Sequence, residues 1–432
     1  MRVLVAGAGG FVGQHIAAEA ARAGHEIIAC GRDTERLRLE FPAWPVVRCD
    51  YTRDTVEDWR HRLQGVDAVV NAVGLFQSEG ANTLEAVHIN GPRNLFDACA
   101  GLGIPKVIQI SALGADSAAQ SRFHLTKRKA DDYCIELAER NGFSGWTVVR
   151  PSIVIGRGGQ STALFSALGA MPWPPRLGSG MWKVQPLHVS DFAYGIRLAL
   201  ESEEPLPRQL DFAGPRPMTT DQLTHTIRRW LLLPPAKVFP LPEWLLRTGS
   251  VFGSVFFFGA LSDESLDMLA RGNTASLAPL QEALHWQPRP LAEALATEPS
   301  AQSDLWHARL YFLRPALRMG LGTMWIVTAI ISAFVYPLEK SIAMTSGLGV
   351  SDSQAAALIY GGAALDAALG SALILNMRPA LAGALQIAAM LVFTVLASIA
   401  VPYAWSDPLG PLTKNLAVLL ATLVMIALEA RR

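Results

Sequence analysis

The sequence has few cysteines, no excess of either charge and, after about residue 315, little charge of any kind. Lys plus Arg and Asp plus Glu number 37 each, so no net field attracts nucleic acid. The four cysteines are scattered without a Cys-x-x-Cys pair, which argues against a disulfide framework or a metal site. We therefore expect buried thiols, no metal and no nucleic-acid partner.

The first thirteen residues combine a β-branched apolar run, a glycine cluster and the start of a helical apolar pattern. This order is typical of the first βα unit of a doubly wound sheet, whose helix N-terminus can bind pyrophosphate. Gly7 would let the chain leave the strand, Gly10 would let the backbone approach phosphate, and Gly13 would let the helix pack on the sheet. These three glycines, together with Phe11 and Val12, predict a dinucleotide-binding turn. The alternative is a glycine turn that binds no ligand.

The end of the second expected strand, His25–Cys30, normally decides between the two nicotinamide cofactors. A carboxylate there binds the ribose 2′-hydroxyl, whereas an arginine accommodates a 2′-phosphate. Arg32 offers a planar fork of donors, and no acidic residue directly precedes it. We predict NADP(H) as the cofactor, with NAD(H) as the alternative in which Asp33 binds the hydroxyl.

Apolar strand patterns alternate with helical ones along the rest of the N-terminal part, which predicts an α/β fold with a doubly wound parallel Rossmann sheet. Further strands are expected at Val46–Asp50, Asp67–Asn71, Lys106–Ile110 and Trp146–Arg150. Ligands bind at the carboxyl ends of such strands. The residues expected there are Asp50, Tyr51, Ala72, Val73 and Gly74. The segment Leu84–Ala100 is expected to be mainly helical, with Asn90 as a buried structural polar group.

Together these residues resemble the short-chain dehydrogenase/reductase superfamily, in its extended and atypical branch. The similarity continues through Arg150-Pro151-Ser152, Pro186–Asp191 and Leu210–Pro215, over roughly residues 1–295. It resembles most the nucleotide-binding accessory subunit of respiratory complex I, whose relatives often lack the chemistry of the reductases. The resemblance implies a nucleotide-binding core over 1–155, with Pro151 at the cofactor, and a substrate lobe over 156–300.

The resemblance also implies a catalytic serine and a Tyr-x-x-x-Lys pair. Ser111 and Lys127 occupy two of these positions, but Phe123 stands where the tyrosine is expected. A phenyl ring cannot donate a proton, so general acid catalysis in the family's form is unavailable. Lys127 would still hold the nicotinamide ribose. His124 is a weak replacement, because consecutive helical side chains point about 100° apart.

Four successive apolar segments after residue 315 each have about the length of a bilayer's hydrocarbon core. They are Met319–Tyr336, Ala355–Asn376, Pro379–Val401 and Leu412–Leu428. In pattern, residues 315–432 resemble the small DoxX-like membrane family of four helices. Most arginines fall on one side of this arrangement, and Lys340 and Lys414 on the other. The positive-inside rule therefore predicts a multi-pass protein of the cell inner membrane with its nucleotide-binding part in the cytoplasm.

Two further stretches bear on the membrane. Asp366 lies in the middle of the second span, where a carboxyl group is costly, so we expect it to face the interior with Gln386 or Asn415 as its partner. Trp244–Leu261 contains three consecutive phenylalanines and is too short to span a bilayer. It is expected either to contact membrane lipid or to be buried in the substrate lobe.

Two functions fit this sequence. The first is an oxidoreductase in which NADPH reduces an apolar carbonyl compound or a quinone-like lipid at the cytoplasmic membrane face. The second is a non-catalytic NADPH-binding protein that stabilises, or senses redox state for, a respiratory or ubiquinone-synthesis assembly in the membrane. Phe123 favours the second function, whereas the retained cofactor residues are compatible with both.

Overall fold

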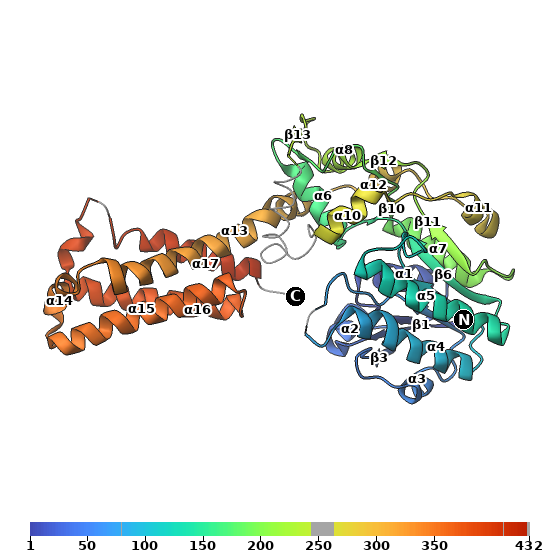
Figure 1. The fold of residues 1–432 in the computed structure, drawn as a ribbon, viewed down its shortest axis with the longest axis horizontal. Coiled ribbons are helices and arrows are strands. Elements are labelled where there is room, and N and C mark those ends of the chain that lie inside the picture. Colours follow the sequence, from blue (N-terminus) through green and yellow to red (C-terminus); the bar gives the residue numbers. More distant parts are fainter. Residues whose placement is uncertain (79, 243–262, 409, 430–432) are drawn as a thin grey trace. The chain divides into compact units, whose positions relative to one another are not determined.

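The computed structural model describes all residues except 79, 243–262, 409 and 430–432. Contacts divide the chain into two compact units, Met1–Arg309 and Leu310–Arg432. Figure 1 shows an α/β sheet with its helices in the first unit and a bundle of long helices in the second. The expectation that Trp244–Leu261 contacts the membrane lies outside the described residues.

A parallel seven-stranded sheet forms the centre of the first unit and confirms the predicted fold class (Figure 1). Its strand order is β11-β6-β5-β4-β1-β2-β3, which places the reversal of winding between β1 and β4. The strands are β1 (Arg2–Ala6), β2 (Glu26–Gly31), β3 (Val46–Arg48), β4 (Ala68–Asn71), β5 (Lys106–Ile110), β6 (Gly145–Pro151) and β11 (Gln209–Phe212). Ligands of such sheets bind at the carboxyl ends of the strands beside this reversal.

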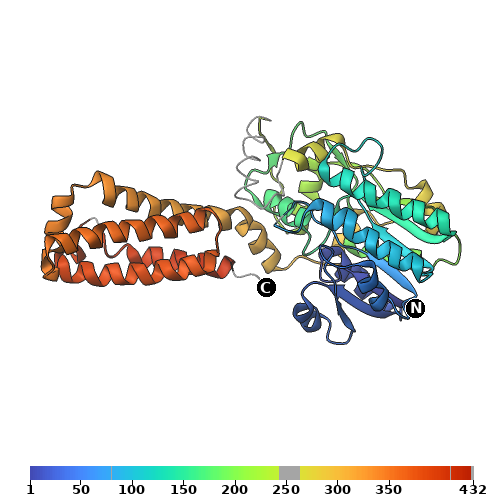
Figure 2. The ribbon, with the colours of Figure 1, turned by 60° about the horizontal axis from the view of Figure 1, so that its bottom comes forward.

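Helices cover both faces of the sheet, as Figure 2 shows from a second direction. Val3 and Val5 of β1 pack into the core beneath α1 (Phe11–Arg22) and α7 (Val189–Glu201). Leu4 and Ala6 point to the opposite core, which is covered by α3 (Val56–Arg62), α4 (Gly91–Gly101) and α5 (Arg122–Asn141). Burial on both faces explains the uninterrupted apolar runs in the sequence. The four cysteines are buried free thiols, as expected.

The helical segment before β5 contains a π-helical turn, Ala86–Asn90, which continues into α4. The expectation that Asn90 is buried is wrong, because Asn90 is exposed and Val87, His88 and Ile89 face inward. A π-helical turn bonds each residue to the fifth along the chain and so shifts the faces of the helix. As a result His88, not Asn90, is the buried polar side chain of this segment.

The first unit contains further helices and short strands besides those that cover the sheet. Thr219 caps the N-terminus of α8 through a capping box. The remaining helices are α2 (Thr34–Glu40), α6 (Gln160–Ala170), α8 (Thr220–Trp230), α10 (Asp263–Arg271), α11 (Ala278–Leu284) and α12 (Leu291–Ala296). The two-residue strands are β7 (Val154–Ile155), β8 (Pro175–Arg176), β9 (Lys183–Val184), β10 (Leu187–His188), β12 (Met218–Thr219) and β13 (Phe239–Pro240).

Three helical stretches of the C-terminal region are long and apolar enough to cross a membrane: residues 302–335, 352–374 and 379–400. They comprise α13 (Gln302–Ile330) with the π-helical turn Ile331–Val335, α15 (Asp352–Ile374) and α16 (Pro379–Ala400). The predicted fourth span begins too early, because residues 411–414 form a turn. Its helix, α17 (Asn415–Glu429), has 15 residues, and at about 1.5 Å per residue it is shorter than a hydrocarbon core of about 30 Å.

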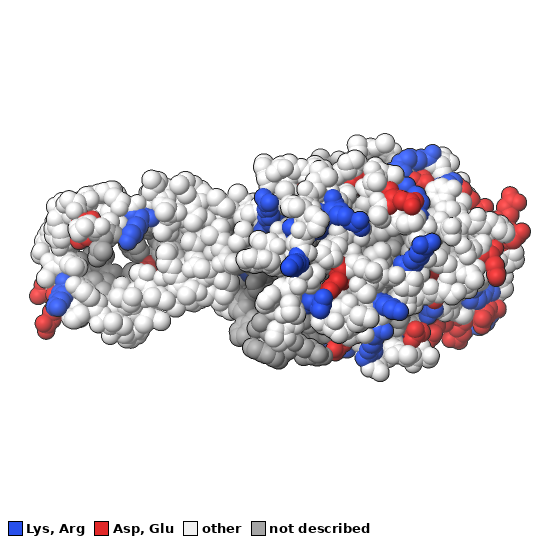
Figure 3. Space-filling model, turned by 90° about the horizontal axis from the view of Figure 1, so that it is seen from above, with Lys and Arg blue, Asp and Glu red and all other residues white. Residues whose placement is uncertain are grey.

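Short elements connect these helices: α14 (Leu338–Thr345) and the 3₁₀ turns Ser346–Leu348 and Pro402–Trp405. Large apolar side chains of the bundle are exposed, among them Phe334, Leu381 and Val395. Figure 3 shows few charged side chains on this unit compared with the first. Apolar outer surfaces of this kind indicate a membrane protein.

The expected pairing of Asp366 is wrong. Asp366 and Gln386 are both buried, yet the described residues contain no hydrogen bond between them. Asn415 instead donates to Thr394 Oγ1 at 2.8 Å. The partner of a buried carboxyl group depends on how the helices pack, and sequence spacing alone does not reveal it.

Candidate functional site

The turn between β1 and α1 is built on glycine. Gly7 has φ +83°, and a Cβ on Gly13 would lie 2.1 Å from the Gly7 carbonyl oxygen, so neither position accommodates a side chain without moving the turn. Gly10 donates its N–H back to Gly7 O at 2.9 Å and precedes α1 without a side-chain cap. The free N–H groups of the first helical turn are therefore available to an anion.

A cavity of about 310 Å³ lies in front of this turn, at the carboxyl ends of β1, β2 and β4. It brings together most of the cofactor residues expected from the sequence: Gly7, Gly10, Arg32, Asp50, Tyr51, Ala72, Val73 and Gly74. Its wall also contains residues not singled out beforehand: Gly9, Gly31, Arg36, Leu37, Cys49, Thr52, Leu75, Asn82 and Val87. Most of these lie beside predicted residues, whereas Asn82 comes from a loop without a recognisable motif.

One end of the cavity is basic. Arg32 Nη1 donates to Asn82 Oδ1 at 2.6 Å, and Arg36 contributes a second guanidinium to the wall. Asp33 also lines the cavity, but its carboxylate accepts the Arg36 backbone N–H at 3.0 Å and so caps α2. Arg36 Nε also donates to Glu40 Oε1 at 2.8 Å. The guanidinium N–H groups of this corner can donate to a negatively charged ligand group.

Asp50 and Tyr51 reach the cavity from the loop after β3. Burial alone would raise the pKa of Asp50, but the hydroxyl and N–H of Thr52, and then the charge of Arg32, hold it below its ordinary value. Tyr51 donates its hydroxyl to Asn71 Oδ1 at 2.8 Å, and Asn71 donates to Gln109 Oε1 at 2.7 Å. This buried chain fixes the cavity floor, so Tyr51 has a structural task beside the predicted one.

Besides Lys127, four predicted cofactor residues lie outside the cavity wall. Gly13 supports the turn from below, and Val12 packs against the core under α1. Phe11 lies against the loop around Gly159, where an added Cβ would come within 2.9 Å of its ring. Pro151 ends β6, and its carbonyl accepts the Leu113 N–H at 2.9 Å. Their predicted contact with the cofactor remains a prediction.

Lys127, also outside the cavity wall, lies directly behind it. Its Nζ donates to Ile110 O at 3.0 Å and to Val73 O at 3.3 Å, and an added Cβ on Gly74 would come within 3.2 Å of the same atom. Burial lowers the pKa of Lys127 to about 8, although the charge of Asp131 acts in the opposite direction. The ammonium group thus sits at the back of the cavity, held by strand-end carbonyls.

The Ser111 hydroxyl has a hydrogen-bond partner that was not predicted from the sequence. This hydroxyl donates a hydrogen bond to Asp131, one turn beyond Lys127 on α5. Burial raises the pKa of Asp131 to about 7, against the effects of the Ser111 hydrogen bond and the Lys127 charge. The spacing of Lys127 and Asp131 on one helix face was visible in the sequence and could have indicated this pair.

Phe123, at the expected tyrosine position, is buried among rings. It stacks on Phe76 with a centroid distance of 4.8 Å and meets His88 and His124 edge-on, each at 5.5 Å. Burial and then the charge of Lys127 lower the pKa of His88 to about 2, so its ring is neutral. Its Nε2 accepts the Leu75 N–H at 3.0 Å, and its Nδ1 therefore donates to Thr126 Oγ1 at 2.9 Å.

His124 points toward the loop after β5, where an added Cβ on Gly114 would lie 3.1 Å from its ring. Burial lowers its pKa. Among the described residues its Nε2 has no hydrogen-bond partner. His124 is thus a neutral ring beside Phe123, which offers no strong proton donor at neutral pH.

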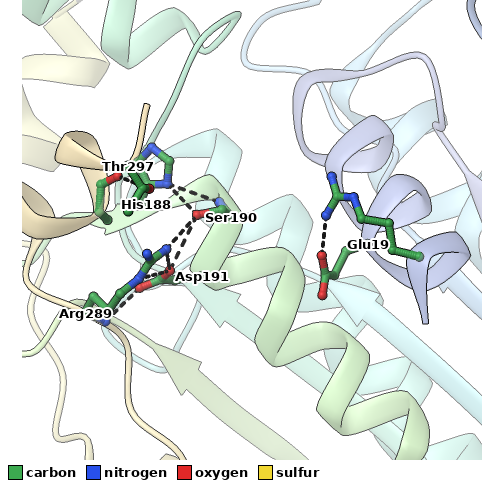
Figure 4. A network of polar contacts seen from close by, with 8 residues as sticks. Glu19, His188, Ser190, Asp191, Arg289 and Thr297 are labelled. Atoms are coloured by element: carbon green, nitrogen blue, oxygen red, sulfur yellow. Dashed lines mark hydrogen bonds and ion pairs between the residues drawn. The ribbon is translucent and has the colours of Figure 1, made fainter. Parts of the chain in front are cut away.

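A polar network anchors the segment Pro186–Asp191 (Figure 4). Arg289 donates to Asp191 through its backbone N–H at 2.7 Å and through Nε at 2.9 Å, and Nη2 reaches Ser190 Oγ at 3.1 Å. His188 Nδ1 lies 2.7 Å from the same hydroxyl. These residues tie the start of α7 to the segment before α12, which is a structural task.

Two family models match the chain. Residues 3–210 match the NAD dependent epimerase/dehydratase family, and residues 322–423 match the DoxX-like family. The mitochondrial NADH dehydrogenase (ubiquinone) 1 alpha subcomplex subunit 9 of Arabidopsis thaliana is 26% identical over 255 residues, which cover 55% of this chain and 62% of that protein. The chain thus spans less than two thirds of that relative's length.

A 2-alkyl-3-oxoalkanoate reductase of Stenotrophomonas maltophilia is 26% identical over 228 residues, covering 48% of this chain and 67% of that protein. Among solved structures, a UDP-glucuronic acid 4-epimerase from Bacillus cereus in complex with UDP-glucuronic acid and NAD superimposes with a TM-score of 0.54 at 16% identity, over 72% of this chain and 99% of that one. These likenesses confirm the NAD-binding fold of the short-chain dehydrogenase/reductase type and the DoxX-like domain.

Proposed function

We propose that this chain, which joins an epimerase/dehydratase-type NAD-binding domain to a DoxX-like membrane domain, is a membrane-anchored NADP(H)-binding protein that retains its nucleotide without tyrosine-based turnover. The observation that carries the proposal is the cavity in front of the Gly7–Gly13 turn, with Phe123 at the tyrosine position behind it. The nucleotide domain is proposed to lie at the cytoplasmic face of the inner membrane.

The basic corner supports NADP(H) over NAD(H). Arg32 and Arg36 both line the cavity, whereas the nearby carboxylate of Asp33 caps α2. A 2′-phosphate would bind the two guanidinium groups through charge-assisted hydrogen bonds. Lys127, at the back of the cavity, would hold the nicotinamide ribose. A bound nicotinamide would supply hydride-transfer chemistry; the residues named here bind and orient it.

The surroundings of Phe123 support binding without turnover. The ring has aromatic neighbours on three sides, His88 is neutral with both nitrogens engaged, and the Ser111 hydroxyl donates to Asp131. A missing positioned proton donor costs about 10²–10⁴ in rate. The two-domain arrangement fits a protein that stabilises a membrane assembly or senses redox state for it. The similar NADH dehydrogenase (ubiquinone) 1 alpha subcomplex subunit 9 is named as a subunit of an assembly.

A second candidate is a reductase of an apolar carbonyl compound or quinone-like lipid. The likeness to a 2-alkyl-3-oxoalkanoate reductase favours it, as does His124, whose Nε2 is free among the described residues beside Phe123. In this case Ser111 would orient the carbonyl, and His124 or water would supply the proton.

The experiment identifies the nucleotide released from detergent-purified protein by mass spectrometry and then follows NADPH absorbance with a panel of ketones and quinones. We expect released NADP(H) and no turnover above the background rate. Turnover by the wild-type protein would replace the first function with the second. Purified protein that neither carries nor takes up NADP(H) would contradict both.

A further inference from the structure

The interior of the second unit contains polar side chains that the nucleotide site does not use. Asp366 on α15 is 6% exposed, Gln386 on α16 is 1% exposed, and Trp325 on α13 is 6% exposed. Within the described residues, hydrogen-bond partners are lacking at Asp366 Oδ1, at both polar atoms of Gln386 and at Trp325 Nε1. Three helices thus each contribute an unpartnered polar group.

These groups surround one layer of the bundle. Asp366 and Gln386 belong to the buried stripes of their helices. Leu369, one turn after Asp366, and Ala389, one turn after Gln386, pack together with Trp325 in a single apolar cluster. The carboxyl, the carboxamide and the indole N–H therefore lie within about two helical turns of one another.

Stability does not account for this polar layer. A buried polar group without a partner costs about 1–3 kcal/mol, and a bilayer offers no water to the outside of the bundle. Apolar side chains would fill the layer at lower cost, as they do in the neighbouring cluster of Leu321, Leu373 and Met425. By contrast, Asn415 and Thr394 in the same bundle satisfy each other.

We propose that this layer binds the uncharged, oxygen-bearing head of a lipid-soluble compound, a carbonyl or a hydroxyl group. The indole and carboxamide N–H groups would donate to its oxygen, and the carboxamide oxygen and Asp366 would accept from a hydroxyl. Met390, Phe393 and Val418, which pack around the layer, suit a hydrocarbon chain.

The charge distribution argues against a phosphate head. Asp366 would repel it, and Arg314 and Arg318 of α13 instead contact Glu429 at the end of α17. A metal ion would find the indole N–H, which is a donor only, among its neighbours. The site extends the proposed function by giving a lipid-soluble compound a place in the membrane unit, and it requires no hydride transfer.

The probe for this site is a long-chain methyl ketone with a chain diazirine and a terminal alkyne, photolysed with the full-length protein in lipid nanodiscs. We expect labelling on α13, α15 or α16 that excess long-chain ketone or alcohol suppresses and the matching alkane does not. Gln386→Leu and Trp325→Phe should each lower labelling by about fivefold or more, which corresponds to one lost hydrogen bond of about 1 kcal/mol.

Thermal unfolding separates this role from a structural one. Gln386→Leu should leave the unfolding temperature unchanged or raise it, because it removes unpartnered groups. The matched control Asn415→Leu removes a partnered amide and should lower the unfolding temperature while labelling is retained. Labelling that competes equally with the alkane, labelling unchanged in both variants, or clear destabilisation by Gln386→Leu overturns the proposal. NADPH binding, measured on the same samples, reports on the nucleotide site independently.

Discussion

Phe76 and Phe123 lie face to face, with an interplanar angle of 3° and a centroid distance of 4.8 Å. Phe123 is buried and Phe76 is half exposed, so the stack runs from the interior of the first unit to its surface. This apolar column stands where a proton-donating hydroxyl is expected in the reductases that the chain resembles.

Phe123→Tyr should therefore create an activity that the wild-type protein lacks. Lys127 stands one turn away on the same helix face, so the new hydroxyl would have the family's partner beside it. We expect NADPH oxidation with a ketone to rise about 10²-fold or more over wild type. Phe123→Leu, which supplies no hydroxyl, is the control. Equal rates for all three proteins would show that more than a proton donor is missing.

Arg32→Gln should reverse the preference for NADPH. Losing one charge-assisted hydrogen bond of about 1.5–3 kcal/mol weakens NADPH binding about 10- to 100-fold, whereas NADH binding should change little. Arg38→Gln removes an exposed guanidinium of α2 that does not line the cavity, and it should leave both affinities unchanged. A parallel loss of NADPH and NADH binding in Arg32→Gln would argue against a 2′-phosphate contact.

Asp131 should make the stability of the first unit depend on pH. Its native pKa of about 7 lies above the ordinary carboxyl value of 3.8, so the native state binds this proton more tightly than the unfolded chain. The resulting stabilisation is complete below about pH 4 and is lost as the pH rises through 7. Relative to Asp131→Asn, the wild-type unfolding temperature should fall by several degrees between pH 5 and pH 7.5.

Asp132 gives the matched control for that measurement, because it is the next residue on α5 and its side chain is 64% exposed. Asp132→Asn should follow the wild-type pH profile. A wild-type profile parallel to that of Asp131→Asn would mean that the buried carboxyl does not titrate in this range.

Gly370→Ala should destabilise the bundle. An added Cβ would lie 2.7 Å from the Gly322 carbonyl oxygen and 2.8 Å from Ile326 Cγ1, where α15 meets α13. Overpacking of this kind costs about 1–3 kcal/mol. Gly361→Ala on the same helix meets nothing within 4 Å and should be neutral or stabilising. Unfolding temperatures in detergent compare the two, and equal values would contradict the close approach of these helices.

Local patterns predicted the framework well. The runs of Val3–Ala6 and Ala68–Val70 are apolar on every residue because both faces of the sheet are covered, and the Gly7–Gly13 spacing is dictated by one tight turn. The residues missed depend on contacts distant in sequence. Asn82 reaches Arg32 across fifty positions, and Asp131 finds Ser111 across twenty. His88 faces inward because Ala86–Asn90 form a π-helical turn, and the sequence contains no pattern that predicts such a turn.

In the membrane part, too, local patterns predicted the helices but not the features that depend on packing. Hydropathy identified the long helices, but the start of α17 and the missing partner of Asp366 depend on how the helices pack. Hydropathy averages over a window of residues, so it cannot place a helix end within one turn.

Titration of NADPH and NADH into the purified full-length protein tests the central claim most directly, with Gly13→Val as the variant whose side chain would collide with Gly7 O. We predict saturable binding to the wild-type protein, tighter for NADPH by about tenfold or more. Gly13→Val should lose binding of both nucleotides while its bundle keeps its helical content. Wild-type protein that binds neither nucleotide even at millimolar concentration would contradict the account.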